Sequence, residues 1–262
     1  MKQYFHIILT ILICSTVFFI CDSSAQEIQI QTDRPDQSES PVVIPVNHFQ
    51  IESGIVFEKD TEDGLTTKSL SYPSLLLRYG VFKNFELRLG MENVHTSSEI
   101  NGLQVNSYGI KPVNIGFKVN VCGEKGLRPD AGIVINWDLP KIASDDYKEY
   151  NLSTSINLVF NNSLSDNLSA GYNLGFSWDG ETAEATYFYT LSFGYELTKH
   201  LSCFLEGYGF IPEQTQADHR LDFGMSLIAL NNLSFDASAG FGITKNAPDF
   251  FVNGGVSIRI PR

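Results

Sequence analysis

Charged residues recur at every second position in several stretches of the chain, between apolar residues at the alternate positions. One stretch reads Phe85-Glu86-Leu87-Arg88-Leu89, so Glu86 and Arg88 share one face of an extended strand. Such a set of acids and bases facing a common interior could serve in two ways. The side chains would either form ion pairs that fill and stiffen the interior, or line it and select among small solutes. The sequence leaves both interpretations open.

The same alternation places further charges on this polar face, where acids outnumber bases. The acid excess of the whole chain would either keep the loops soluble or give a lumen that attracts cations. The acids are Glu52, Glu86, Glu92, Asp130, Asp138, Glu196, Glu206, Asp222 and Asp236, and the bases are Arg78, Arg88, Lys118 and Arg259. We expect the selectivity lining to comprise Glu52, Arg78, Glu86, Arg88, Glu92, Lys118, Asp222, Asp236 and Arg259.

Residues 26–46 differ from the rest of the chain, because three prolines interrupt regular structure and charges of both signs lie close together. We expect an extended segment outside the regular fold. One hypothesis is that it folds back into the interior as a plug carried by Asp33, Arg34 and Asp36. Arg34 would then meet Glu52 or Glu86, and Asp33 would meet one of the interior bases Arg78, Arg88 and Arg259. The alternative is a solvated tail.

Other chemistries find little support in the sequence. His48, His95, His200 and His219 fall at predicted strand ends or in loops, with no serine placed for nucleophilic catalysis, so we expect no enzyme. No Cys/His spacing predicts a metal site, and nothing predicts a cofactor. The net charge of −12 argues against nucleic acid as a partner. Cys122 and Cys203, which are distant in the predicted strand order, are expected to remain unpaired thiols.

The elements that would position these charges are strands of about ten residues with one apolar and one polar face. The connections between them alternate, longer after odd strands and shorter after even ones; the longest covers residues 94–112. The twelve expected strands are residues 49–58, 69–79, 85–93, 113–121, 130–139, 152–160, 168–178, 187–197, 201–210, 221–230, 233–241 and 250–260.

This pattern predicts an all-β fold, a transmembrane antiparallel up-and-down β-barrel of about twelve strands. The apolar faces would point into outer-membrane lipid and the polar faces into a lumen. Aromatic residues near strand ends suit interfacial girdles. A secreted β-sandwich is the alternative fold, but a Greek-key connectivity gives no reason for short and long connections to alternate.

The first residues predict export. Lys2 precedes an apolar run, residues 7–21, which is short for a membrane-spanning helix, and small residues follow up to Ala25. We therefore expect a signal peptide over residues 1–25, an extended segment over residues 26–46 and a barrel over residues 47–262. The alternative of lipidation at Cys21 is disfavoured by the bulky Ile20 before it.

Several segments carry a family resemblance. The resemblance begins with Thr32-Asp33-Arg34-Pro35, which a proline-rich stretch and a first strand beginning at residue 49 follow. It continues in residues 74–90, 109–121, 128–140 and 250–260. The chain resembles the outer-membrane barrels of the MetA-pathway of phenol degradation family over nearly all of the part that follows the expected signal peptide. The resemblance implies a barrel that passes small organic molecules and that barrel insertion machinery places in the bacterial outer membrane. One departure is the end of the chain, Ile260-Pro261-Arg262, where such barrels carry an aromatic residue.

The predicted function is that of a passive channel or transporter for small molecules, including aromatic or apolar ones. A barrel of twelve strands lies between narrow barrels filled by side chains and wide, water-filled pores. The alternative is a structural or surface-interaction barrel with an occluded lumen, whose loop at residues 94–112 would contact a partner.

Overall fold

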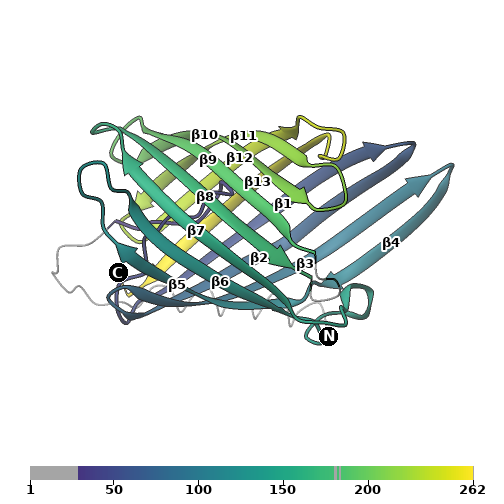
Figure 1. The fold of residues 1–262 in the computed structure, drawn as a ribbon, viewed down its shortest axis with the longest axis horizontal. Helices are drawn as coiled ribbons and strands as arrows, with labels where there is room; N and C mark the ends of the chain where they lie inside the picture. The colour runs from purple at the N-terminus through teal and green to yellow at the C-terminus, as the bar shows by residue number, and fades with distance from the viewer. Residues whose placement is uncertain (1–28, 180–181, 183, 262) are drawn as a thin grey trace, which may run out of the picture.

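The strands of the chain close into one antiparallel barrel (Figure 1). The structure is a computed structural model that describes residues 29–179, 182 and 184–261. The expected signal peptide, residues 1–25, lies outside the described residues. Within the described ranges, no helix is long and apolar enough to cross a membrane. Both cysteines of this part of the chain, Cys122 and Cys203, are free thiols.

Thirteen strand segments form the wall, and the last pairs with the first, with Phe49 opposite Ile260. Segments β4 and β5 lie end to end along β3, so the barrel has twelve wall positions, as the sequence predicts. The segments are β1 (Phe49–Glu62), β2 (Leu65–Phe82), β3 (Phe85–Ile100), β4 (Leu103–Ile110), β5 (Val113–Cys122), β6 (Asp130–Leu139), β7 (Ser153–Ser163), β8 (Leu168–Trp178), β9 (Thr186–Glu196), β10 (Leu201–Pro212), β11 (Asp218–Leu230), β12 (Leu233–Gly242) and β13 (Phe250–Ile260).

The two faces of the wall differ in polarity as the alternation predicts. Large apolar side chains such as Leu87, Leu174 and Phe223 are exposed on the outside, each by about half of its surface. The residues between them point inward and are mostly small or polar. An outward apolar face is stable only against lipid, so this is the fold of a transmembrane barrel.

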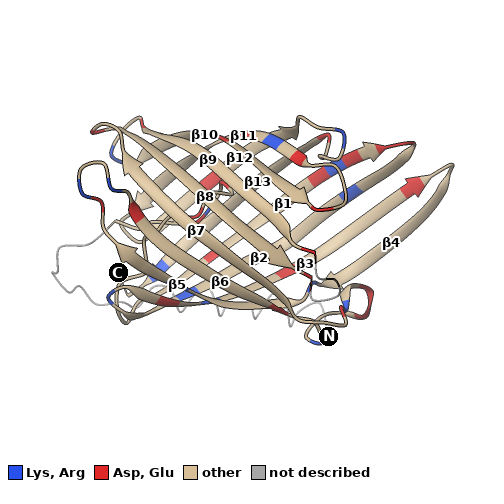
Figure 2. Ribbon diagram, in the orientation of Figure 1, with Lys and Arg blue, Asp and Glu red and all other residues tan. Residues whose placement is uncertain are grey.

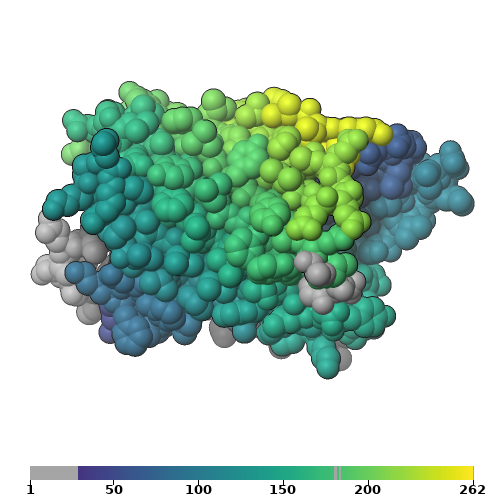
Figure 3. Space-filling model, in the orientation of Figure 1, coloured from purple at the N-terminus to yellow at the C-terminus, as the bar shows by residue number. Residues whose placement is uncertain are grey.

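The two ends of the barrel differ in their connections. At the turn end, short turns join β2 to β3 and β11 to β12, and both the start of β1 and the end of β13 lie there. At the opposite, hairpin end, the β1–β2 and β3–β4 hairpins project beyond the rest of the wall (Figures 1 and 3). β2 alone has 18 residues, whereas a strand needs about 9–11 to cross a bilayer.

These projecting hairpins correct the expectation of long loops at residues 59–68 and 94–112. Both regions are strand, closed by two-residue turns at Asp63-Gly64 and Asn101-Gly102, whose four residues all have positive φ. Asp-Gly and Asn-Gly favour this tight hairpin turn because their backbone tolerates positive φ. The turn signals were therefore present in the sequence, but the polar, weakly alternating strands around them concealed the hairpins.

The lumen contains residues 29–46, which we call the lumen segment. It begins at the turn end, where the Ile30 amide donates to the carbonyl of Asn231 at 2.8 Å. It returns to the same end, where Val46 forms a bridge with Gly80. The strands cover most of this segment in the space-filling view (Figure 3). The chain thus runs into the barrel and back before β1 begins.

We expect Gly80→Ala to weaken the return of the lumen segment to the wall. A Cβ at Gly80 would lie 2.2 Å from the Pro45 carbonyl oxygen and 2.3 Å from that of Ile44, so the backbone would have to move. The measurement is the temperature at which the folded, fast-migrating band is lost on a gel. Gly171→Ala is the control, because its Cβ would meet no atom closer than 3.9 Å. Equal melting of the two variants would contradict the expected clash.

Candidate functional site

The charged residues expected in the lumen point into it, with one at its margin. Eight of the nine are buried: Glu52, Arg78, Glu86, Arg88, Lys118, Asp222, Asp236 and Arg259. Glu92 is partly exposed and pairs with Lys111 at 3.0 Å near the hairpin end. Figure 2 shows the uneven distribution of charge around the wall, since β7 and β8 contain no charged residue.

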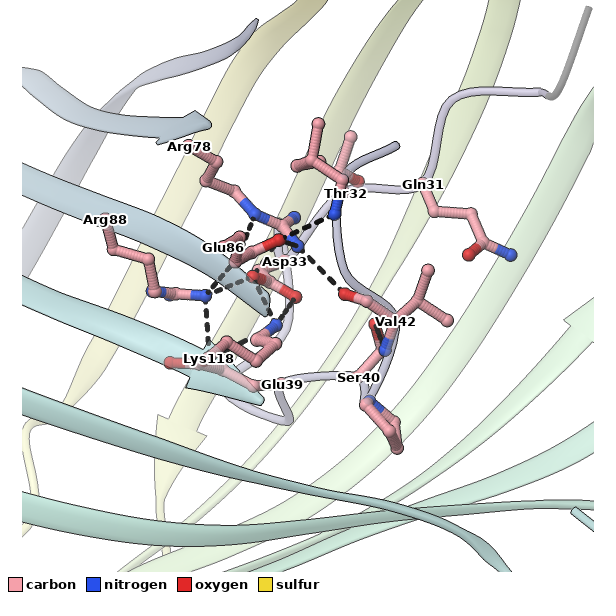
Figure 4. Close-up of polar contacts among 12 residues, drawn as sticks. Gln31, Thr32, Asp33, Glu39, Ser40, Val42, Arg78, Glu86, Arg88 and Lys118 are labelled. Carbon is pink, nitrogen blue, oxygen red and sulfur yellow. Dashed lines mark hydrogen bonds and ion pairs between the residues drawn. The ribbon is translucent and has the colours of Figure 1, made fainter. Parts of the chain in front are cut away.

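Asp33 of the lumen segment lies among three bases contributed by three different strands (Figure 4). Its carboxylate is 2.7 Å from Arg88 Nη1, 2.7 Å from Lys118 Nζ and 3.1 Å from Arg78 Nη1. Burial alone would raise the pKa of Asp33, but the charges of Arg78, Lys118 and Arg88 hold that pKa well below its ordinary value. Asp33 is therefore an ionised carboxylate at the centre of the site.

Further acids complete this group, which we call the Asp33 network. Arg78 binds Glu86 through two nitrogens, at 2.8 and 3.0 Å, and Glu52 through the third at 2.9 Å. Arg88 also pairs with Glu39 of the lumen segment at 3.1 Å. The network consists of the acids Asp33, Glu39, Glu52 and Glu86 and the bases Arg78, Arg88 and Lys118, with a formal charge of −1.

Arg34 is anchored on the other side of the lumen. Its guanidinium is 3.1 Å from Asp236 and 3.2 Å from the Asn253 side-chain oxygen. It lies flat against Gly54 and Gly255, which face each other across β1 and β13; a Cβ on either would lie within 2.5 Å of it. The pairing of Arg34 with Asp236 differs from the expected Glu52 or Glu86. Those two acids are already engaged by Arg78, which leaves Arg34 to the opposite wall.

The apex of the lumen segment is held through its backbone. Glu206 accepts hydrogen bonds from the amides of Gln37 and Ser38, at 2.7 and 2.8 Å. Asn173 exchanges two hydrogen bonds with the main chain of Glu39, at 2.8 and 3.0 Å. Sequence reasoning missed Asn173 as a site residue. Its position on the polar face of a strand, between two apolar neighbours, indicates that it points into the lumen. Many other neutral residues occupy such positions, so the pattern does not single out Asn173.

The remaining expected residues have other partners. Asp36 accepts a hydrogen bond from Ser192 at 3.2 Å, and Arg259 reaches the carbonyl of Gln29 at 3.4 Å near the turn end. Of the three bases expected as partners of Asp33, Arg78 and Arg88 are confirmed, whereas Arg259 lies elsewhere and does not pair with it. In the described part of the chain, no group of three or more His, Cys, Asp or Glu residues is arranged to hold a metal ion.

The lumen segment leaves open space on both of its sides. A cavity of about 500 Å³ lies toward the turn end, between the lumen segment and a wall side in which serine, glycine and asparagine of β7–β12 are frequent. A second cavity of about 280 Å³ lies toward the hairpin end, between the segment and Tyr208 and Phe251 of the wall. Arg34, Pro35 and Asp36 line both cavities. These three residues therefore separate the two spaces.

The relationship of this barrel to known proteins is visible in its sequence. Residues 32–260 match the family described as "Putative MetA-pathway of phenol degradation". The chain belongs to this family. The match confirms the resemblance expected from the sequence, and it includes both the charged part of the lumen segment and every strand of the barrel. No curated protein sequence matches this MetA-pathway family chain.

Solved structures share the fold of this MetA-pathway family chain at low sequence identity. The COG4313 outer membrane channel from Pseudomonas putida F1 is 12% identical, with a TM-score of 0.67 over 88% of this chain and 100% of that one. The translocator domain of the autotransporter NalP from Neisseria meningitidis is 10% identical, with a TM-score of 0.55 over 82% of this chain and 89% of that one. Both likenesses concern the fold alone.

We expect Arg88→Met to destabilise the barrel, because Asp33, Glu39 and Glu86 would lose one of their cationic partners. Breaking a buried ion pair costs about 3–5 kcal/mol when water is excluded, and less where the lumen is wet. The measurement is the urea midpoint of unfolding in detergent. Leu87→Ala, on the outward face of the same strand, is the control for lost volume. Adding Glu39→Gln should recover part of the loss, and a strictly additive double variant would contradict the assigned pair.

We expect Gly255→Ala to displace Arg34 from its seat and to loosen the lumen segment. Gly254→Ala is a closely matched control, since its Cβ would meet only the Asp236 carbonyl oxygen at 3.6 Å. The measurement is protease cleavage within residues 29–46 of the intact, folded protein. Cleavage should be faster in Gly255→Ala than in Gly254→Ala. Equal resistance of the two variants would show that the seat is not needed to hold the segment.

Proposed function

We propose that the protein is a channel for small molecules in the outer membrane of a Gram-negative bacterium, with a lumen narrowed by residues 29–46. One observation carries this proposal: the two cavities flank the lumen segment and share only Arg34, Pro35 and Asp36. A barrel built only as a scaffold has no need of open space on both sides of a thin partition. The outward apolar face supports the membrane location.

The direction of insertion follows from the connections. In outer-membrane barrels the short turns face the periplasm and the long connections face outward. The turn end would therefore be periplasmic and the projecting hairpins extracellular. Under this orientation the lumen segment enters from the periplasmic mouth, after removal of a signal peptide over residues 1–25.

The hairpin-end cavity supports a small, partly apolar solute. Its lining combines apolar residues, among them Val56, Tyr208 and Phe251, with charged and polar ones such as Arg220 and Asn253. A cavity of about 150 Å³ is enough to hold benzene, so about 280 Å³ accommodates a single aromatic ring with substituents. A ring that carries a polar group matches this mixed lining. The description of the family, which concerns phenol degradation, is consistent with this class of solute.

The lumen segment would act as a plug in this channel. It is joined to one wall by the Asp33 network, to the opposite wall by Arg34, and to β8 and β10 through backbone hydrogen bonds. Each attachment is polar, and polar contacts exchange with water at modest net cost. A rearrangement near the apex would then widen the junction between the cavities without unfolding the barrel.

A structural or surface-interaction barrel is the second candidate. The observation in its favour is the Asp33 network itself, because buried ion pairs on this scale would also serve to fix a closed lumen. The projecting β1–β2 and β3–β4 hairpins would then provide the contact surface. The two candidates differ in whether solutes cross the barrel.

Planar-bilayer conductance of two variants separates them. Deletion of residues 29–45 should raise the single-channel conductance, because the partition is removed while every wall strand remains. Ser38→Cys with Thr190→Cys, in a Cys122→Ser, Cys203→Ser background, places two thiols where the native hydroxyls are 2.5 Å apart. Oxidation of this pair should link the apex covalently to β9 and keep the conductance low. Reduction of the disulfide should restore the conductance of the unlinked protein.

The outcomes distinguish the proposals clearly. An assembled deletion variant with unchanged conductance would exclude the role of residues 29–46 as a plug. Absence of conductance in both the full chain and the deletion variant would exclude the channel and favour the structural barrel. Ser38→Cys alone is the control for the effect of the substitution.

A further inference from the structure

The cavity toward the hairpin end is bounded on its outer side by an ion pair between two distant strands. β1 runs from the turn end to the hairpin end, and β11 runs in the opposite direction. Among the residues that line the cavity, Glu58 and Arg220 are those nearest the hairpin end on these two strands. Arg220 Nη1 lies 2.8 Å from Glu58 Oε2. Because β12 and β13 separate the two strands in the sheet, this ion pair reaches across the lumen side of both.

We call Glu58 and Arg220 the crossbar, since they lie between the cavity and the open mouth of the barrel. Their side chains are 36% and 17% exposed. Tyr208 and Phe251, which line the cavity beside them, are only 3% and 4% exposed. The exposed surface therefore falls from the crossbar to the aromatic lining behind it. A solute that enters this cavity from the hairpin end has to pass the crossbar.

The guanidinium of Arg220 is held by its edges. In addition to the contact with Glu58, Asp218 accepts hydrogen bonds from Nε at 2.9 Å and from Nη2 at 2.5 Å. Carboxylates bind a guanidinium in its own plane, so all three nitrogens are engaged while the flat faces are not used by these bonds. An arginine fixed in this way presents a flat cationic face to a planar partner.

Aromatic rings already lie near this guanidinium. Its central carbon is 5.9 Å from the ring centroid of Tyr208 and 5.9 Å from that of Phe210. The Tyr208 ring continues inward to Phe251, whose centroid is 6.4 Å away. Among the described residues, Arg220 is the one base of the cavity lining that is placed over aromatic rings. The crossbar thus leads directly onto the aromatic part of the lining.

We propose that Arg220 is a specificity-determining residue at the outer entrance of this cavity, where it favours planar aromatic solutes over aliphatic solutes of similar volume. An aromatic ring stacks on the guanidinium as it passes the crossbar and then moves onto Tyr208 and Phe251. A saturated ring has no π-face for either contact. The inference rests on the proposed channel function. It adds the residue that selects the solute and the property selected, which is planarity.

The test is the rate at which a thiol inside the cavity reacts with reagents of different shape. Val56→Cys, in the Cys122→Ser, Cys203→Ser background, places a reporter thiol in the cavity lining. The purified protein is treated with benzyl methanethiosulfonate or with cyclohexylmethyl methanethiosulfonate, and each rate is divided by that of a free thiol in solution. We expect the aromatic reagent to react faster by about two- to fivefold, the factor that one cation–π contact provides.

Two variants of Arg220 separate selection from structural support. Arg220→Lys keeps a positive charge beside Glu58 and Asp218 but has no flat face, so the ratio of the two rates should fall close to one. Arg220→Met should raise both rates, because the crossbar is lost, and should also bring their ratio close to one. Lys59→Met is the matched control. It breaks the ion pair of Lys59 with Asp249, at 3.4 Å on the outward side of β1, and should leave the native ratio unchanged.

The outcomes decide the role of Arg220. A native ratio near one, or a native ratio retained in Arg220→Lys, would overturn its role in selection. Equal rates in the native protein and in Arg220→Met would do the same, since solutes would then bypass the crossbar, and so would a reporter thiol that reacts in no variant. Conductance in a planar bilayer tests the channel separately. A selective entrance in a protein without conductance would overturn the channel and leave Arg220 as the selecting residue of a binding cavity.

Discussion

The carboxylate of Asp33 is the contact on which the interior of this barrel depends. Three bases on β2, β3 and β5 point into the lumen, and Asp33 contacts all three of them. The wall provides only two acids beside these bases, Glu52 and Glu86. The chain provides a further acid from a segment before the first strand, so the charge balance of the wall is incomplete until this segment is in place. Buried ion pairs contribute little net stability, but removing one partner is costly, which makes the arrangement specific rather than strong.

The attachments around the lumen differ in kind, and this difference has physical consequences. The Asp33 network is ionic, with bidentate contacts that fix both distance and direction. The apex is held mainly by hydrogen bonds from its own backbone amides to Glu206 and by the hydrogen bonds that Asn173 exchanges with the main chain of Glu39. Backbone contacts of this type do not require particular side chains on the segment. The segment thus has one end fixed by side-chain charge and an apex fixed by main-chain geometry.

Much of the architecture could be predicted from the sequence because one physical rule governs it. A wall between lipid and water requires alternation of apolar and polar residues, and that alternation identified the strands, their number and the inward direction of Arg78, Arg88 and Lys118. The projecting hairpins were missed because they lie beyond the apolar band, where the alternation weakens. The prediction of a partner for Arg34 was wrong for a different reason. Which acids lie across a lumen depends on strand order, stagger and barrel width together, and no local pattern encodes that distance.

The seat of Arg34 relates the lumen segment to the closure of the barrel. Gly54 belongs to the first strand and Gly255 to the last, and they face each other across the one pairing that joins the two ends of the sheet. Neither glycine alone forms the flat surface on which the guanidinium lies. The seat therefore exists only after the first and last strands have paired, so Arg34 cannot reach its final position in an open sheet. Assembly of this protein accordingly has a required order, in which the wall closes before its interior is completed.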